Sequence, residues 1–277
     1  MHESSTRGLH SAEAAGESFV QSSAFELLSR AGFVARGLIY AIIGILALKL
    51  AFGHGGKLTD QKGALHTVAH QPFGKILLTL VAIGLGGYSL WRLIRAAIGH
   101  GPEGSDKGFD RVAAFASGIA YGAMCALAIE ILLGAGGGSG ANVKKSTAGV
   151  LGWPAGTWIV GIVGVVLIGV ALYQGYRGIT KKFLDESKVE EMGPQMKKWI
   201  SRLGTFGHLA RMVVFGLVGV FLVKAAIDYR PSKAVGLDGA LAKIVNHSYG
   251  PFLLGVVATG LIAFAVYSLS DARYRRI

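Results

Sequence analysis

The sharpest constellation of ionisable residues in this sequence is two lysines and one glutamate at matching positions of an internal repeat. Lys49, Glu130 and Lys224 each stand near the end of a long apolar stretch. If the repeats surround a common axis, two ammonium groups could meet one carboxylate and compensate partly buried charge. The same groups could line a polar vestibule for an ion or small anionic solute, or remain three separate interfacial charges. We hypothesise that Glu130 pairs with at least one of the lysines.

Two arginines form a second candidate pair. Arg36 and Arg211 lie a turn or two inside apolar stretches, again at matching positions of the repeat. Ionisable residues inside a membrane are costly and indicate a functional site by default. Because both arginines lie near an interface, we favour a structural role, in which the guanidinium reaches headgroup phosphate or neighbouring carbonyl groups.

Two histidines have a spacing that metal sites use. His66 and His70 are four residues apart, with His54 nearby in the sequence, and two imidazoles on one helical face can bind one metal ion. No carboxylate or thiol ligand accompanies them, and another repeat has Ala242 and Asn246 at these positions. We therefore favour a solvated helix face and expect no metal and no cofactor. No Ser-His-Asp set and no H-E-x-x-H motif is present, so we expect no catalytic residue.

The elements that must position these residues are membrane-spanning helices. The chain has 277 residues, of which 52% are hydrophobic and 16% charged, and its mean hydropathy is +0.49. This is more apolar side chain than a soluble core of this size could hide. Six stretches approach the roughly 20 residues that cross a bilayer, namely Phe33–Phe52, Phe73–Leu93, Val112–Ala135, Trp153–Gln174, Phe206–Ile227 and Tyr249–Leu269. The sequence therefore predicts an all-α membrane protein with six transmembrane helices.

The distribution of basic residues predicts the orientation. The two termini and the even-numbered loops carry twice as many Lys and Arg residues as the opposite side. By the positive-inside rule, both termini lie in the cytoplasm, and we expect a multi-pass protein of the bacterial cytoplasmic (inner) membrane. The net charge of +12 is spread along the ends of apolar spans. The expected partner is therefore the anionic headgroups of the cytoplasmic leaflet, with no role for nucleic acid.

The spans repeat in pairs. A shift of 175 positions aligns Arg36 with Arg211, and a shift of 82 aligns Arg95 with Arg177. We divide the chain into a disordered cytoplasmic tail (1–24), repeat 1 (25–101), repeat 2 (106–180), a charged, solvated linker (181–199) and repeat 3 (200–277). Three helix-loop-helix repeats allow a pseudo-threefold arrangement. Each loop of the outer repeats holds a short amphipathic piece, around Leu65 and Leu241, which we expect to lie flat on the outer membrane surface.

The repeat resembles a known family. The segments that carry the resemblance are Gly63-Ala64-Leu65, Gln71-Pro72-Phe73-Gly74, Leu77-Leu78, Val81-Ala82, Gly84-Leu85, Tyr88 and Leu90-Trp91-Arg92-Leu93, preceded by Ala35-Arg36-Gly37 with Tyr40 and Gly44. They are similar to the repeat of the bacterial membrane family called domain of unknown function 1206. The middle repeat departs from the pattern, with Ser117 in place of the helix arginine and Glu130 in place of lysine. The resemblance implies a fold and a membrane location but no activity.

Three classes of function remain open. We favour a nonenzymatic role that is structural, lipid-interacting or partner-binding in the bacterial envelope, because the spans are almost uninterrupted apolar sequence. A small channel or transporter for an ion or small solute is the alternative, suggested by three repeats around a possible central axis and by Lys49, Glu130 and Lys224. Transport usually leaves polar groups or broken helices at the midplane, which these spans lack. An intramembrane enzyme is the least favoured class.

Overall fold

The structure is a computed structural model, and it describes residues 23–54, 58–98, 108–134, 147–245 and 249–276. The expected tail lies almost wholly outside these residues. Six long helices have the length and hydropathy to cross a membrane. They are α2 (Ser23–Ala51), α4 (Gly74–Ile98), α5 (Gly108–Leu132), α7 (Gly156–Thr180), α8 (Pro194–Ile227) and α10 (Gly250–Tyr274). The predicted all-α fold with six spans is confirmed.

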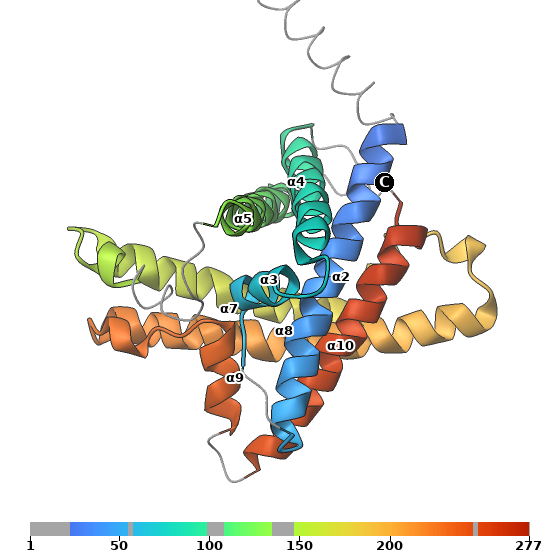
Figure 1. Cartoon of the computed structure of the whole chain (residues 1–277). Coiled ribbons are helices and arrows are strands. Elements are labelled where there is room, and N and C mark those ends of the chain that lie inside the picture. Colours follow the sequence, from blue (N-terminus) through green and yellow to red (C-terminus); the bar gives the residue numbers. More distant parts are fainter. Residues whose placement is uncertain (1–22, 55–57, 99–107, 135–146, 246–248, 277) are drawn as a thin grey trace, which may run out of the picture.

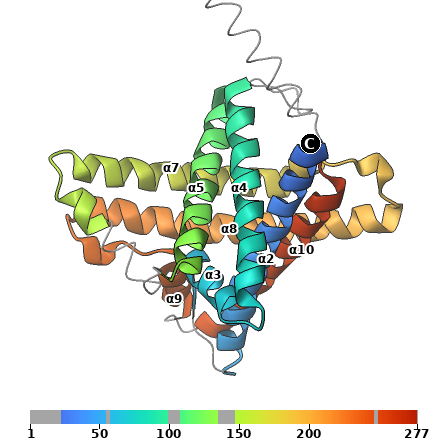
Figure 2. The same cartoon turned by 45° about the horizontal axis from the view of Figure 1, so that its top comes forward.

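The six helices pack as three pairs, each joining the second helix of one repeat to the first helix of another. These pairs are α4 with α5, α7 with α8, and α10 with α2. In Figure 1, α7 and α8 cross α2 and α10 steeply. Figure 2 shows α4 and α5 side by side in front of α7 and α8. Contacts of α2 with α4 and of α8 with α10 join the pairs. Within the described residues, the two helices of the middle repeat, α5 and α7, make at most sparse contact with each other.

One glycine recurs at the start of the second helix in every repeat. Gly74, Gly156 and Gly250 each begin a helix immediately after a tight turn. A Cβ atom at any of them would collide with a backbone carbonyl of the short segment before the turn. Only glycine allows this close approach of backbone to backbone. The turn that sends the chain back across the bundle therefore depends on this position.

Glycines also bring α7 and α8 together. A Cβ atom at Gly164 would lie 2.9 Å from the carbonyl oxygen of Gly219, and one at Gly219 would lie 2.8 Å from that of Gly164. Membrane helices approach closely where small residues face one another, since no larger side chain holds the backbones apart. This reciprocal contact fixes the crossing point of the pair.

The two short amphipathic helices are buried elements of the bundle. They are α3 (Gln61–Ala69) and α9 (Leu237–Val245). The side chains of Leu65 and Leu241 are 0% exposed. Helix α3 packs on α2, α4 and α5, and α9 packs on α8 and α10. The expectation that their apolar stripes rest on the outer membrane surface is not supported, because these stripes face other helices of the bundle.

The segment between repeats 2 and 3 is packed rather than solvated along its first half. The ring of Phe183 is 0% exposed and stacks on His208 with centroids 5.1 Å apart. The backbone pairs with the C-terminal segment, where the N–H of Lys188 donates to the carbonyl oxygen of Tyr274 (2.7 Å) and that of Arg276 to Glu186 (3.0 Å). The sequence predicted a solvated linker here. Its residues 181–193 instead fold against the ends of α7, α8 and α10.

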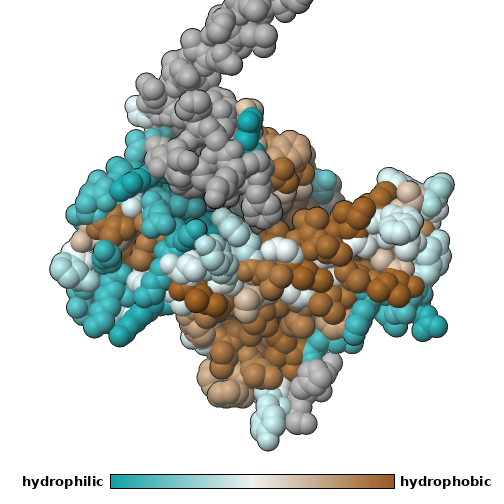
Figure 3. Space-filling view, turned by 180° about the vertical axis from the view of Figure 1, so that it is seen from behind, coloured by the Kyte–Doolittle hydropathy of each residue, from teal (hydrophilic) through white to brown (hydrophobic). Residues whose placement is uncertain are grey.

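The outer surface of the bundle is strongly apolar. Large exposed side chains follow the lengths of the spans, for example Trp158, Ile162 and Val165 on α7. Figure 3 shows hydrophobic residues across the middle of the rear face, while hydrophilic residues gather on the side where α7 ends and α8 begins. An apolar surface this extensive is incompatible with water and is what lipid-facing helices present.

Candidate functional site

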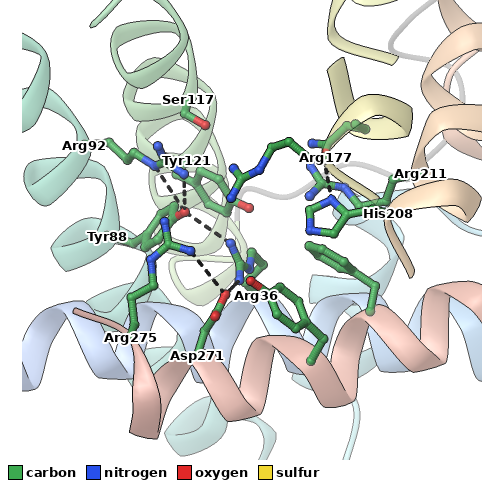
Figure 4. Close-up of a pocket in the computed structure, with 13 residues that line it drawn as sticks. Arg36, Tyr88, Arg92, Ser117, Tyr121, Arg177, His208, Arg211, Asp271 and Arg275 are labelled. Atoms are coloured by element: carbon green, nitrogen blue, oxygen red, sulfur yellow. Dashed lines mark hydrogen bonds and ion pairs between the residues drawn. The ribbon is translucent and has the colours of Figure 1, made fainter. Parts of the chain in front are cut away.

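A polar cavity of about 70 Å³ lies where the three helix pairs meet. All six spans contribute residues to its wall, and Figure 4 shows their side chains converging from opposite sides. Five of these residues are arginines, namely Arg36, Arg92, Arg177, Arg211 and Arg275. The cavity has room for about two water molecules. It is therefore a compact, basic site inside a protein whose exterior is apolar.

Arg36 is the buried centre of this site. Its side chain is 7% exposed and forms an ion pair with Asp271 of α10, with Nη2 2.7 Å from Oδ2. Its Nε donates to Ser268 Oγ (2.9 Å) and its Nη1 to Tyr88 Oη (3.2 Å). The guanidinium also lies 4.9 Å from the ring centroid of Phe33. The interpretation that Arg36 reaches the membrane surface is wrong, because its side chain is held between α2, α4 and α10.

Two carboxylates neutralise part of the positive charge. Asp271, 1% exposed, pairs with Arg36 and lies 3.8 Å from Arg275 Nη1. Glu186 of the folded linker pairs with Arg177 (2.6 Å) and with Arg275. Burial by itself would raise the pKa of Glu186, but the guanidinium groups of Arg275 and Arg177 outweigh burial and hold that pKa far below its usual range. Five arginines against these two carboxylates leave three positive charges in excess.

The remaining two arginines have no carboxylate partner among the described residues. Arg92 donates through Nε (3.1 Å) and Nη2 (3.0 Å) to the hydroxyl oxygen of Tyr88. The guanidinium of Arg211 lies 4.3 Å from the ring centroid of Phe264. With the amide of Gln174 oriented by its neighbours, its oxygen accepts from Arg211 (3.1 and 3.3 Å) and its nitrogen donates to His208 Nδ1 (2.6 Å). In the described part of the chain, both arginines thus contact neutral groups.

The repeats explain why there is space here. A shift of 175 positions aligns Arg36 with Arg211, and a shift of 81 aligns Arg36 with Ser117 in the middle repeat. Ser117 of α5 lines the cavity. The two arginines contact the same ring, that of Phe264. The structure therefore brings the predicted pair Arg36 and Arg211 into one site, with a serine at the third position.

The structure does not bring the lysines and the glutamate together. Lys49, Glu130 and Lys224 are exposed, and no ion pair joins them in the described part of the chain. Their helices α2, α5 and α8 each pack on a second helix of another repeat, and α3 contacts both α2 and α5. Helix α3 therefore lies between α2, which carries Lys49, and α5, which carries Glu130. The hypothesis that Glu130 pairs with a lysine is not supported.

His66 and His70 are neighbours on α3 with ring centroids 6.5 Å apart. His70 Nδ1 lies 2.8 Å from the carbonyl oxygen of His66, a contact within the helix. Among the described residues, no group of three metal-ligating side chains occurs. Within the described residues, the fold therefore brings no third metal-ligating side chain to these two histidines.

The sequence did not point to several residues that line the cavity or pair with its arginines. The carboxylates Asp271 and Glu186, the neutral pair Gln174 and His208, and Tyr88 all have their partners on other helices. The repeats do contain a signal for Asp271. A shift of 82 aligns Arg95 with Arg177, and a shift of 176 aligns Arg95 with Asp271 in repeat 3. A carboxylate at an arginine position predicts a pair within the bundle.

Comparison with known proteins identifies the repeat. The model of the Domain of Unknown Function (DUF1206) matches residues 31–99, 112–181 and 206–275. The chain belongs to this family. The DUF1206 match confirms the resemblance and the three tandem repeats. A curated relative, "Uncharacterized protein YxxB" of Bacillus subtilis (strain 168), is 32% identical over 252 residues, which cover 90% of each chain. No solved structure matches.

Proposed function

We propose that this DUF1206 chain is a nonenzymatic protein of the bacterial cytoplasmic membrane that binds an anionic group, with a lipid-interacting role in the envelope. The observation that carries the proposal is the cavity in which five arginines from across the three repeats face two carboxylates. Buried charge of one sign is costly unless it is paired. An anion from outside the chain would supply the missing partner.

The orientation of the chain supports an anionic lipid as that partner. The cavity lies toward the ends of the spans where both termini and most basic residues are found. The positive-inside rule places these ends at the cytoplasmic leaflet. Headgroups of that leaflet are attracted by nearby Lys and Arg, at about 1 kcal/mol for each residue close to the surface. The ligand is therefore concentrated on the side where the cavity lies.

A test compares bilayers that differ in headgroup charge. Purified protein would be placed in nanodiscs of phosphatidylcholine alone or with added phosphatidylglycerol, and its thermal unfolding would be followed. A ligand present at about 100 times its Kd stabilises the folded state by about 2.7 kcal/mol, so we expect a higher Tm with the anionic lipid. Equal Tm values in both bilayers would refute the lipid-binding proposal, and chemical conversion of the recovered lipid would refute the nonenzymatic part.

The same cavity makes a small-anion transporter the second candidate. Ionisable residues inside a membrane bundle often mark an ion or substrate pathway, and the structure places Arg36 and Asp271 inside the bundle. The opposite half argues against an open path, because Ile43, Leu254 and the buried faces of α3 and α9 fill it with apolar side chains. Flux of a small anion into liposomes that carry the protein would favour transport over binding.

A further inference from the structure

We infer that four residues lining the cavity, namely Arg92, Ser117, His208 and Arg211, form a seat for a single phosphate-type oxoanion. This inference rests on the proposed function and gives the anion a place and a chemical class. The four residues come from α4, α5 and α8, which belong to three different repeats. They will be called the oxoanion seat.

Charge distinguishes the two arginines of the seat from the other three arginines of the cavity. Arg36, Arg177 and Arg275 each form an ion pair with Asp271 or Glu186. Arg92 and Arg211 contact only a phenol oxygen, a carboxamide and aromatic rings in the described structure. A guanidinium gains most from an oxoanion because its planar N–H groups match two oxygens at once. The uncompensated charge is therefore carried by Arg92 of α4 and Arg211 of α8.

Two buried nitrogens of the seat have no hydrogen-bond partner among the residues that the structure describes. They are Nε of Arg211 and Nε2 of His208, a residue that is 4% exposed. Because Gln174 donates to His208 Nδ1, the proton of the neutral imidazole lies on Nε2, which is then a donor. Buried donors without a partner are uncommon in folded proteins. An oxoanion would accept from both of them.

The middle repeat supplies the space for the anion. Ser117 stands where the other repeats have Arg36 and Arg211, so one of three equivalent guanidinium groups is replaced by a short hydroxyl. That hydroxyl can donate to a ligand oxygen without filling the cavity. The cavity volume of about 70 Å³ suits one tetrahedral group and is far below the 300–1,000 Å³ of pockets that take larger molecules. The ligand is therefore a phosphate group, either free or at the tip of a lipid headgroup.

The test measures binding to the purified full chain and to four single variants. Arg211→Gln and Arg92→Gln remove donors, Ser117→Arg fills the seat, and Arg202→Gln is the control because Arg202 is an exposed arginine of α8 outside the cavity. The probes are inorganic phosphate in detergent and phosphatidic acid in phosphatidylcholine nanodiscs, each followed by titration of Tm. Loss of one charged hydrogen-bond donor weakens binding by about 10- to 100-fold.

The inference is supported if Arg211→Gln, Arg92→Gln and Ser117→Arg each weaken binding by about that factor, while Arg202→Gln binds as the parent does. Saturation by both probes assigns the seat to the phosphate group itself. Saturation by phosphatidic acid alone assigns it to a lipid headgroup, and saturation by inorganic phosphate alone assigns it to a free anion and removes the lipid-interacting role.

Two outcomes would overturn the inference. If anionic lipid stabilises the parent and all four variants equally, the oxoanion seat is wrong although the proposed function stands. If neither probe stabilises the parent, both are wrong. A fifth variant, Arg211→Lys, guards against loss of folding, since it keeps the charge but lacks the planar fork. We expect it to unfold as the parent does without ligand, and to bind phosphate more weakly than the parent but more tightly than Arg211→Gln.

Discussion

The ion pair between Arg36 and Asp271 allows a quantitative test of the fold. Asp271→Asn removes the negative charge but keeps the size of the side chain and one acceptor oxygen. Asp271 is 1% exposed, the Arg36 side chain is 7% exposed, and their charged atoms are 2.7 Å apart. Removing one partner from a buried pair costs about 3–5 kcal/mol because the other charge stays buried. We expect a loss near the lower limit, since Asn can still accept from Arg36.

The assay is a double-mutant cycle in mixed micelles. Unfolding by sodium dodecyl sulfate would be followed through tryptophan fluorescence for the parent, Asp271→Asn, Arg36→Gln and the double variant. The two residues are in direct contact, so the coupling energy should reach about 1–3 kcal/mol. Asp228→Asn is the matched control, because Asp228 and its partner Lys233 form an exposed pair, and it should leave the unfolding midpoint unchanged.

The reasoning would be refuted by additivity. If the double variant loses the sum of the two single losses within about 0.5 kcal/mol, Arg36 and Asp271 do not stabilise the folded state as a pair. A loss for Asp228→Asn as large as that for Asp271→Asn would also refute it, because burial would then have no effect on the cost.

Three further predictions concern packing, pH and orientation. Gly219→Val should destabilise the protein by about 1–3 kcal/mol because a side chain there meets the backbone of α7, whereas Gly169→Val should have little effect on unfolding because Gly169 faces open space. The pKa of Glu186 is lowered in the folded state, so its ionised carboxylate stabilises the fold fully above the ordinary pKa of about 4.5 and progressively less as the pH falls below that value. Proteolysis at Lys188 should therefore be faster in acid, and a pH-independent rate would contradict this. A reporter active only outside the cytoplasm, fused after Ile277, should stay inactive, and strong activity would reverse the orientation.

The sequence was sufficient for the elements and their order. Long apolar stretches fix the six spans because transfer of such segments to lipid is a property of each stretch alone. The glycine that begins each second helix, such as Gly74, could be matched across the repeats because the turn that it allows is also local. The same patterns failed for α3, whose apolar stripe is equally suited to lipid and to other helices. Its position against α2, α4 and α5 depends on the whole bundle.

The sequence determined that this chain is a six-span membrane protein of three repeats, with equivalent arginines at Arg36 and Arg211. Only the tertiary structure decided which charges meet, because the helix pairs form between different repeats. It buried Arg36 against Asp271 and placed Ser117 and Arg211 in the same cavity. It also left Glu130 exposed without a lysine partner in the described residues. Electrostatic contacts depend on distances between helices, and neither composition nor periodicity specifies those distances.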